Sequence, residues 1–145
     1  MTRTRKAAKI KHVSKEFDGI WWCASLPNGW EAIREKQCAT FTKDPGLGAV
    51  QVSAARRITG PVTDEDLIEF AGGRVPSGIE LSELAFGAFS GFSAEYSKEG
   101  THWKEWWLRS GSLILYITYN VKQGKEGLER DDVESLVASL KPTLS

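Results

Sequence analysis

The stretch Thr101–Val121, THWKEWWLRSGSLILYITYNV, decides the fold of this chain. It holds three of the six tryptophans and two of the three tyrosines, and its apolar run is broken only at Ser110-Gly111-Ser112. Two stretches of β-forming residues joined by a short glycine-containing turn are typical of a β-hairpin. We therefore predict a hairpin with an aromatic surface here, and the rest of the fold is built around it.

The flanking sequence adds strands and helices in a definite order. Turn signals and alternating apolar residues predict strands at 16–26, 37–41, 49–58, 86–96, 102–109 and 113–121. Helical spacing predicts helices at 63–71, where Thr63 begins a capping box, and at 131–140, where Asp131 is the expected N-cap. The loop at 74–84 separates the two halves. This order, βββαβββα, predicts an α+β fold: a twisted antiparallel sheet of about six strands with two main helices packed on it.

Charge is unevenly placed in an otherwise neutral chain. Nineteen basic residues balance nineteen acidic ones, so no overall field attracts nucleic acid. The exception is the first fifteen residues, which carry several cations before the first acid, Glu16. We predict that 1–15 is a flexible basic tail and that 16–145 is a single domain. A weak contact of this tail with phosphates or acidic partners is the alternative.

The sequence shows no targeting or membrane segment. No apolar run approaches the roughly 20 residues that a spanning helix requires, and the basic start lacks the apolar stretch of a secretory signal. We therefore predict a cytoplasmic protein with no membrane association, present as a monomer or a homodimer. Cys23 and Cys38 are expected to be small buried thiols, with a disulfide as the alternative if the chain is exported.

The segment Pro27–Trp30, a Pro-x-Gly-Trp turn, and the closing helix after the Tyr-rich strand at 112–120 carry a family resemblance. Together with the element order they resemble the Mog1/PsbP-like α/β/α sandwich group. The resemblance covers 16–140 and implies the fold. Members of the group differ widely in role, so it implies no single activity and no catalytic residue.

Catalytic signals are sparse. His102 is the one candidate general base, but no serine lies in a G-x-S-x-G elbow. The acidic groups at 64–66 and 131–134 sit at predicted helix N-termini, where capping explains them. Two cysteines and two distant histidines lack the spacing of a zinc site. We therefore predict no enzyme activity, no metal and no cofactor.

Aromatic residues are the stronger functional signal, because Trp, Tyr and Arg dominate protein-binding hot spots. Strand alternation places Glu105 between Trp103 and Trp107, which argues against a phosphate-tracking nucleic-acid surface. It also predicts one exposed tryptophan from each of the pairs 21–22 and 106–107. The candidate binding residues are Trp22, His102, Trp103, Trp107, Arg109 and Tyr116.

We therefore predict a non-catalytic accessory module that recognises a protein partner through an aromatic sheet surface, with an immunity-type role as one form. The alternative is a small ligand-binding protein or hydrolase. It would use a cleft beside the loop at 74–84, with His102 and Arg109 as its polar groups.

Overall fold

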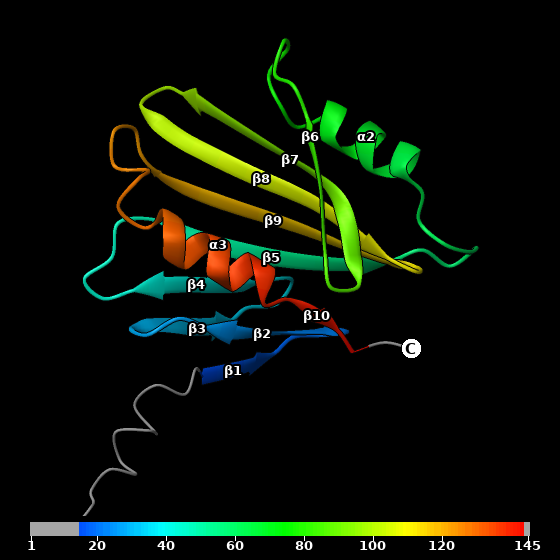
Figure 1. The fold of residues 1–145 in the computed structure, drawn as a ribbon, viewed down its shortest axis with the longest axis horizontal. Coiled ribbons are helices and arrows are strands. Elements are labelled where there is room, and N and C mark those ends of the chain that lie inside the picture. Colours follow the sequence, from blue (N-terminus) through cyan, green and yellow to red (C-terminus); the bar gives the residue numbers. More distant parts are fainter. Residues whose placement is uncertain (1–14, 144–145) are drawn as a thin grey trace, which may run out of the picture.

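The computed structural model describes residues 15–143, so the predicted basic tail lies outside the described residues except for Lys15. The large sheet is antiparallel throughout and dominates the view in Figure 1. In sheet order its seven strands are β3 (Trp30–Arg34), β4 (Ala39–Lys43), β5 (Ala49–Arg56), β9 (Leu113–Lys122), β8 (Thr101–Ser110), β7 (Phe89–Lys98) and β6 (Ser82–Phe86).

The hairpin predicted from Thr101–Val121 is confirmed: it forms β8 and β9, which are interior strands of this sheet. Short turns join β6, β7, β8 and β9 into a meander. The turn between β7 and β8 is made by Glu99 and Gly100, which both have positive φ, at 53° and 82°. Two left-handed residues in a row are what a tight hairpin needs to match the twist of its strands.

A second, smaller sheet consists of β1 (Lys15–Asp18), β2 (Trp22–Leu26) and β10 (Lys141–Pro142), with β2 in the centre. The last strand therefore lies beside β2, with Lys141 opposite Cys23 and Pro142 opposite Trp22. The side chains of Trp22, Ala24 and Leu26 point into the core of the large sheet, and the ring of Trp22 lies 6.2 Å from that of Phe41 on β4. The small sheet thus covers part of one face of the large one.

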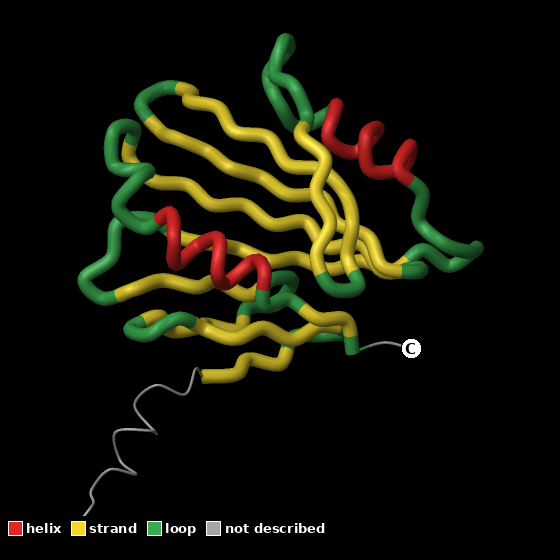
Figure 2. The backbone as a smooth tube through the Cα atoms, viewed as in Figure 1, coloured by secondary structure: helices red, strands yellow, loops and turns green. Residues whose placement is uncertain are grey.

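The two helices pack on opposite faces of the large sheet. Helix α3 (Arg130–Ala138) joins the core that contains Trp106, Leu108 and the small sheet. Helix α2 (Asp64–Gly72) covers a separate core that contains Phe92 and Trp107. Figure 2 shows both helices against the strands. The molecule is therefore layered, with α2 on one side of the sheet and α3 with the small sheet on the other, in an α+β fold.

Within residues 15–143 the structure has ten strands where the sequence predicts six. The segment predicted as one strand at 16–26 is the hairpin β1–β2, because the chain reverses at Gly19–Trp21. Trp21 has φ of 76°, and a Cβ at residue 19 would lie 2.1 Å from the Trp22 ring. The short β3, β6 and β10 were not predicted, and β6 occupies the end of the loop expected at 74–84.

One of the two predicted helix N-caps is confirmed and the other is wrong. The capping box at Thr63 is present: its hydroxyl accepts from the Asp66 amide at 3.2 Å, and the Asp66 carboxylate accepts from the Thr63 amide at 2.9 Å. The prediction of Asp131 as the N-cap of the second helix was wrong, because α3 begins at Arg130 and its N-cap is Glu129. The Glu129 side chain makes no capping bond because it is committed elsewhere.

The tryptophan pairs are more deeply buried than alternation alone predicts. Trp106 is 3% exposed and Trp107 is 0% exposed, so neither member of that pair reaches the surface. The physical reason is the layering: α3 covers the face of Trp106 and α2 covers the face of Trp107. In the other pair Trp22 is 3% exposed and Trp21 is half-buried.

Candidate functional site

Strand β8 divides the chemistry-bearing residues between the two faces of the sheet. Its odd-numbered residues from Trp103 to Arg109 lie on the face that carries α2, which we term the α2 face. His102 and Lys104 lie on the opposite, α3 face with Trp106. His102 and Arg109 are therefore on opposite faces and towards opposite ends of one strand, so they do not line one cleft.

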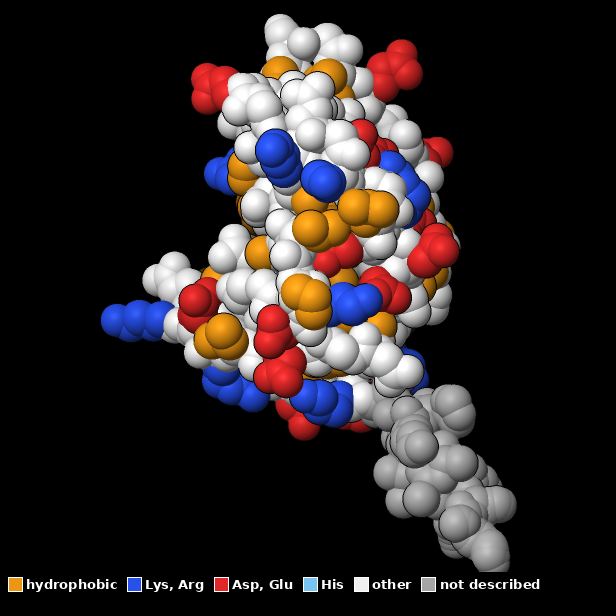
Figure 3. All heavy atoms as spheres, turned by 90° about the vertical axis from the view of Figure 1, so that its left-hand side faces the viewer, with side chains coloured by type: hydrophobic (Ala, Val, Ile, Leu, Met, Phe, Trp, Pro, Cys, Tyr) orange, Lys and Arg blue, Asp and Glu red, His pale blue; other side chains and the backbone are white. Residues whose placement is uncertain are grey.

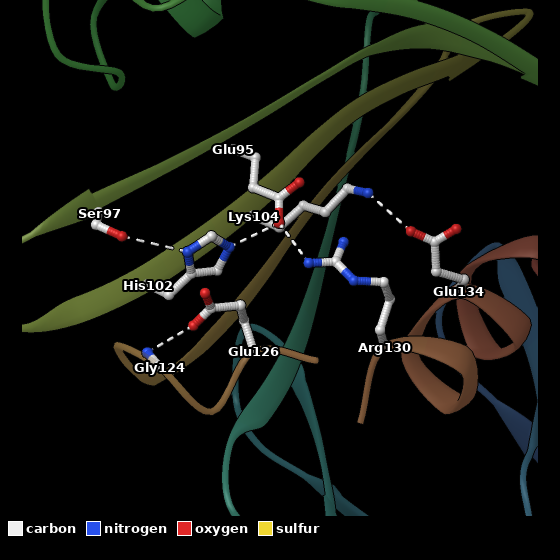
Figure 4. Close-up of polar contacts among 8 residues, drawn as sticks. All are labelled: Glu95, Ser97, His102, Lys104, Gly124, Glu126, Arg130 and Glu134. Atoms are coloured by element: carbon white, nitrogen blue, oxygen red, sulfur yellow. Dashed lines mark hydrogen bonds and ion pairs between the residues drawn. The ribbon is translucent and has the colours of Figure 1, made fainter. Parts of the chain in front are cut away.

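The first candidate site is a polar cluster on the α3 face, shown in Figure 4, which we term the His102 cluster. Its members are Glu95, Ser97, His102, Lys104, Glu126, Arg130 and Glu134. The Nε2 atom of His102 lies 2.7 Å from a carboxylate oxygen of Glu95, and Nδ1 lies 3.3 Å from the Ser97 hydroxyl. Arg130 at the start of α3 donates to the same Glu95 oxygen at 3.2 Å.

Charges within the His102 cluster balance one another. Lys104 donates to Glu134 at 2.8 Å, which joins β8 to α3, as the bond from Arg130 to Glu95 joins β7 to α3. Burial alone would raise the pKa of Glu95, but hydrogen bonds from His102 and Arg130, with the charge of Lys104, outweigh it and hold that pKa below its usual range. The cluster joins α3 to the sheet, and its carboxylates already neutralise its cations. It therefore favours a structural role over anion binding.

The second candidate site lies on the α2 face around a buried carboxylate. Glu105 is 3% exposed and accepts hydrogen bonds from two tyrosines, Tyr116 on β9 at 2.6 Å and Tyr96 on β7. Arg74, just after α2, donates from Nε to the Tyr116 hydroxyl at 3.0 Å, and its guanidinium lies 5.0 Å from the Tyr116 ring centre. A continuous polar chain thus runs from Tyr96 through Glu105 and Tyr116 to Arg74.

Aromatic side chains extend this chain into a surface. Trp103 lies directly across from Tyr96 on the neighbouring strand, and both are half-buried. The ring of Phe70, on α2, lies 5.2 Å from that of Tyr116 and is 38% exposed. We term the set of Phe70, Arg74, Tyr96, Trp103 and Tyr116 the aromatic row.

Glu105 also changes the titration of the tyrosines that it binds. Burial raises the pKa of Tyr116 most, and the hydrogen bond to Glu105 and its negative charge raise it further, well above the ordinary value. The same causes act in the same order on Tyr96. Both phenols therefore stay protonated at neutral pH and act as fixed donors to the carboxylate.

The structure places the six predicted site residues in four different parts of the molecule. Trp103 and Tyr116 share the aromatic row. Trp22 and Trp107 are core residues that no partner can reach, although Trp107 supports the row from beneath with its ring stacked 5.9 Å from Tyr116. His102 belongs to the His102 cluster, and Arg109 lines a separate hollow.

Sequence reasoning missed Phe70, Arg74 and Tyr96 as neighbours of Tyr116. The sequence did show Tyr96 and Glu105 on predicted strands, and cross-strand pairing could have joined them. Nothing in the sequence places α2 over β8, so the contribution of Phe70 and Arg74 depends on tertiary packing. From the sequence, Glu105 was recognised only as a negative charge between two tryptophans. In the structure its carboxylate lies at the centre of the site.

A hollow of about 350 Å³ on the α2 face, termed the Arg109 hollow, lies between β6 and the start of α2. Arg109 donates to Asp64 at 2.7 Å across it. Its lining residues are Asp64, Glu83, Leu84, Ala85, Ser90, Gly91, Phe92 and Arg109. It includes the end of the loop expected at 74–84 and Arg109, but not His102.

The end of the molecule that carries the loops joining β4 to β5 and β9 to α3 is mixed in character. Figure 3 shows positive, negative and hydrophobic side chains interspersed over it. Leu47 and Leu128, in those two loops, are 47% and 68% exposed. Among the described residues, neither sign of charge dominates this end.

The described residues offer no grouping of metal ligands, and their two cysteines are not paired with each other. Within residues 15–143 no three His, Cys, Asp or Glu side chains are grouped so as to hold a metal ion. Cys23 and Cys38 are free thiols. Over the same residues, no helix is both long enough and apolar enough to cross a membrane.

Comparison with known proteins gives the fold. No family model and no curated protein matches the chain. A solved structure from Bacteroides thetaiotaomicron is similar over 92% of this chain at 17% identity and a TM-score of 0.66, and this chain spans about half of that protein (50%). LpqN of Mycobacterium tuberculosis, which is involved in cell envelope biogenesis, is similar over 90% of this chain and 86% of its own, at 14% identity and a TM-score of 0.55.

These likenesses establish the Mog1/PsbP-like fold that the sequence resembled. Cyanobacterial PsbP from Synechocystis is more remote, with 10% identity and a TM-score of 0.40 over 90% of this chain and 93% of its own. At such low sequence identities, the similarities establish the fold of this chain but do not assign it the role of any similar protein.

Proposed function

We propose that this chain is a non-catalytic protein-binding module that recognises its partner through the aromatic row. The observation that carries this proposal is the double hydrogen bond to Glu105, which fixes Tyr96 and Tyr116 from two different strands. Rigid aromatic side chains lose little conformational entropy when a partner covers them, so they bind tightly for their area.

The composition of the aromatic row supports this function. Tyrosine, tryptophan and arginine are the residue types most enriched in binding hot spots. Arg74 lies over the Tyr116 ring, an arrangement that holds its guanidinium while leaving donors for a partner.

The absence of an assembled catalytic group in this region fits a binding role better than turnover. Glu105 accepts from both tyrosines and is 3% exposed, so it cannot reach a substrate as a general base. Tyr116 has its hydroxyl engaged on both sides, by Glu105 and Arg74. What the row presents to a partner is ring surface and a guanidinium.

The test is quantitative capture of proteins from the cells that make the chain, with wild type and Trp103→Ala compared. We expect a partner recovered by wild type to be reduced about tenfold or more by Trp103→Ala, the effect of removing a central aromatic anchor. Ile58→Ala is the matched control, because Ile58 is 95% exposed and lies outside the row. Equal loss in both variants, or none in either, contradicts the proposal.

The two free cysteines bear on the cellular compartment in which the chain acts. We propose that the module acts in the cytoplasm, a location that two free thiols suit because reducing compartments keep cysteines unpaired. Cell fractionation with an antibody to the chain tests this location. Recovery with the cytoplasmic marker supports it, and recovery with an envelope or extracellular marker contradicts it.

A further inference from the structure

Among residues 15–143, strand β6 leaves one side of its backbone unpaired. It ends the seven-stranded sheet, and within those residues it pairs with β7 alone, through a two-residue turn at 87–88. Such a hairpin closes with a hydrogen-bonded pair, here Phe86 and Phe89, and bonded and non-bonded pairs alternate along an antiparallel ladder. The backbone groups of Glu83 and Ala85 therefore point outward, and both residues are exposed.

The same two residues face the Arg109 hollow. Alternation along β6 puts the Glu83 and Ala85 side chains on the α2 face, where they line the hollow together with Phe92 and Arg109. Its volume of about 350 Å³ lies within the range of small ligand sites. An open strand edge and a side-chain hollow thus adjoin along one element.

Charge in the hollow selects the side chain that fits. Arg109 is paired with Asp64 at 2.7 Å, and Glu83 forms no ion pair with any residue from 15 to 143. The two carboxylates outnumber the one guanidinium, so the hollow is net acidic. Ala85 and Phe92 provide apolar lining on the α2 face, which suits the aliphatic stem of a long basic side chain.

We propose that the outer edge of β6 binds an extended peptide segment by strand addition, with an arginine or lysine of that segment in the Arg109 hollow. The peptide backbone pairs with the outward groups of Glu83 and Ala85 and supplies the main-chain hydrogen bonds. The basic head pairs with Glu83 beside Asp64. This site lies on β6 and does not depend on the aromatic row.

The experiment titrates the full chain with a fluorescent octapeptide that alternates threonine and valine around a central arginine, followed by anisotropy. A peptide with glutamate in place of the arginine is the comparison. We expect the arginine peptide to bind and the glutamate peptide to bind at least several-fold more weakly. Glu83→Gln should weaken the arginine peptide about two- to fivefold, the effect of one partly exposed charge pair.

Variants of the backbone and of the two surfaces make the test specific. Ala85→Pro removes an outward donor that the hairpin does not use, so the fold should survive while binding is lost; a thermal melt checks the fold. Glu99→Gln, in the β7–β8 turn, and Trp103→Ala should leave peptide affinity unchanged. Equal binding of both peptides, or undiminished binding by folded Ala85→Pro, overturns the proposal.

Discussion

The hydroxyl of Tyr116 donates to the buried carboxylate of Glu105 at 2.6 Å, across the pairing of β8 with β9. Tyr96 reaches the same carboxylate from β7, so three adjacent strands are joined through one side chain on the α2 face. A buried charge is tolerated only where its acceptor sites are satisfied. Glu105 meets that condition with side chains alone, and in doing so it fixes the surface on which we propose that a partner binds.

Replacing Glu105 tests this relationship. Glu105→Ala leaves two phenols without their acceptor and opens space beneath them, and it should lower the free energy of unfolding by about 3 kcal/mol. Urea denaturation of wild type and variant measures the loss. Glu69→Ala, an exposed change on α2, is the control. A loss for Glu105→Ala no larger than for the control contradicts the account.

The three tyrosines should all lose their protons at a pH well above that of an ordinary tyrosine. Burial, followed by a bonded carboxylate, raises the pKa of each of them; Tyr96 and Tyr116 are held by Glu105, and Tyr119 by Glu129. A raised folded pKa stabilises the fold fully below the unfolded value of about 10, and this stability is lost as the pH rises toward the folded pKa.

Absorbance at 295 nm against pH measures that titration. We expect little tyrosinate signal from the native protein at about pH 10, and a steep rise only where alkaline unfolding begins. The same titration in concentrated guanidinium should show ordinary tyrosines. A native curve that coincides with the denatured one contradicts the hydrogen bonds to Glu105 and Glu129.

The sequence predicted the elements that carry their own periodicity. The β8–β9 hairpin, the strand before it and the capping box at Thr63 were all recoverable, because alternation, turn residues and capping chemistry act within a few residues. The α+β class followed from their order. The short β3, β6 and β10 were missed, since a short strand gives little local signal and is stabilised mainly by the partners it finds in the sheet.

The candidate site was less predictable than the fold. Alternation correctly separates Trp106 from Trp107, but it cannot tell that helices cover both faces, so it wrongly predicts one of them exposed. Helix α2 is far in sequence from β8, and its docking creates the contact of Arg74 with Tyr116. Burial and long-range contacts are properties of the packed molecule, and the site depends on both.

The His102 cluster predicts a pH dependence with a definite sign. The pKa of Glu95 is lowered in the fold, so its contribution to stability is present above the unfolded value of about 4.3 and is lost as the pH falls through the folded value. Glu95→Gln should therefore reduce stability at neutral pH by up to about 1 kcal/mol, because the site is partly exposed.

The difference between wild type and Glu95→Gln should shrink from about pH 5 downward and vanish once wild-type Glu95 is protonated. Urea denaturation at several pH values follows it. Glu99→Gln, at an exposed turn, should show no such convergence. A gap that widens toward acid pH reverses the predicted sign and contradicts the role given to Glu95.

Glu129 fixes the β4–β5 loop to the start of α3. Its carboxylate accepts from the amides of Leu47 at 3.2 Å and Gly48 at 3.0 Å and from the Tyr119 hydroxyl at 2.8 Å. Glu129→Ala should cost about 2–3 kcal/mol and speed hydrogen exchange at those two amides, which lose their acceptor. Exchange at Leu47 and Gly48 that stays at the wild-type rate in a folded variant contradicts this role.

Site-specific photocrosslinking in the native cells tests the central claim, partner recognition through the aromatic row, most directly. The photoreactive amino acid p-benzoylphenylalanine replaces Phe70 in one strain and, as the control, the more exposed Ile58 in another. We predict that position 70 yields one discrete crosslinked protein, that position 58 does not, and that adding Trp103→Ala removes the product. A product of equal strength from position 58, or no product from position 70 in a folded chain, contradicts the claim.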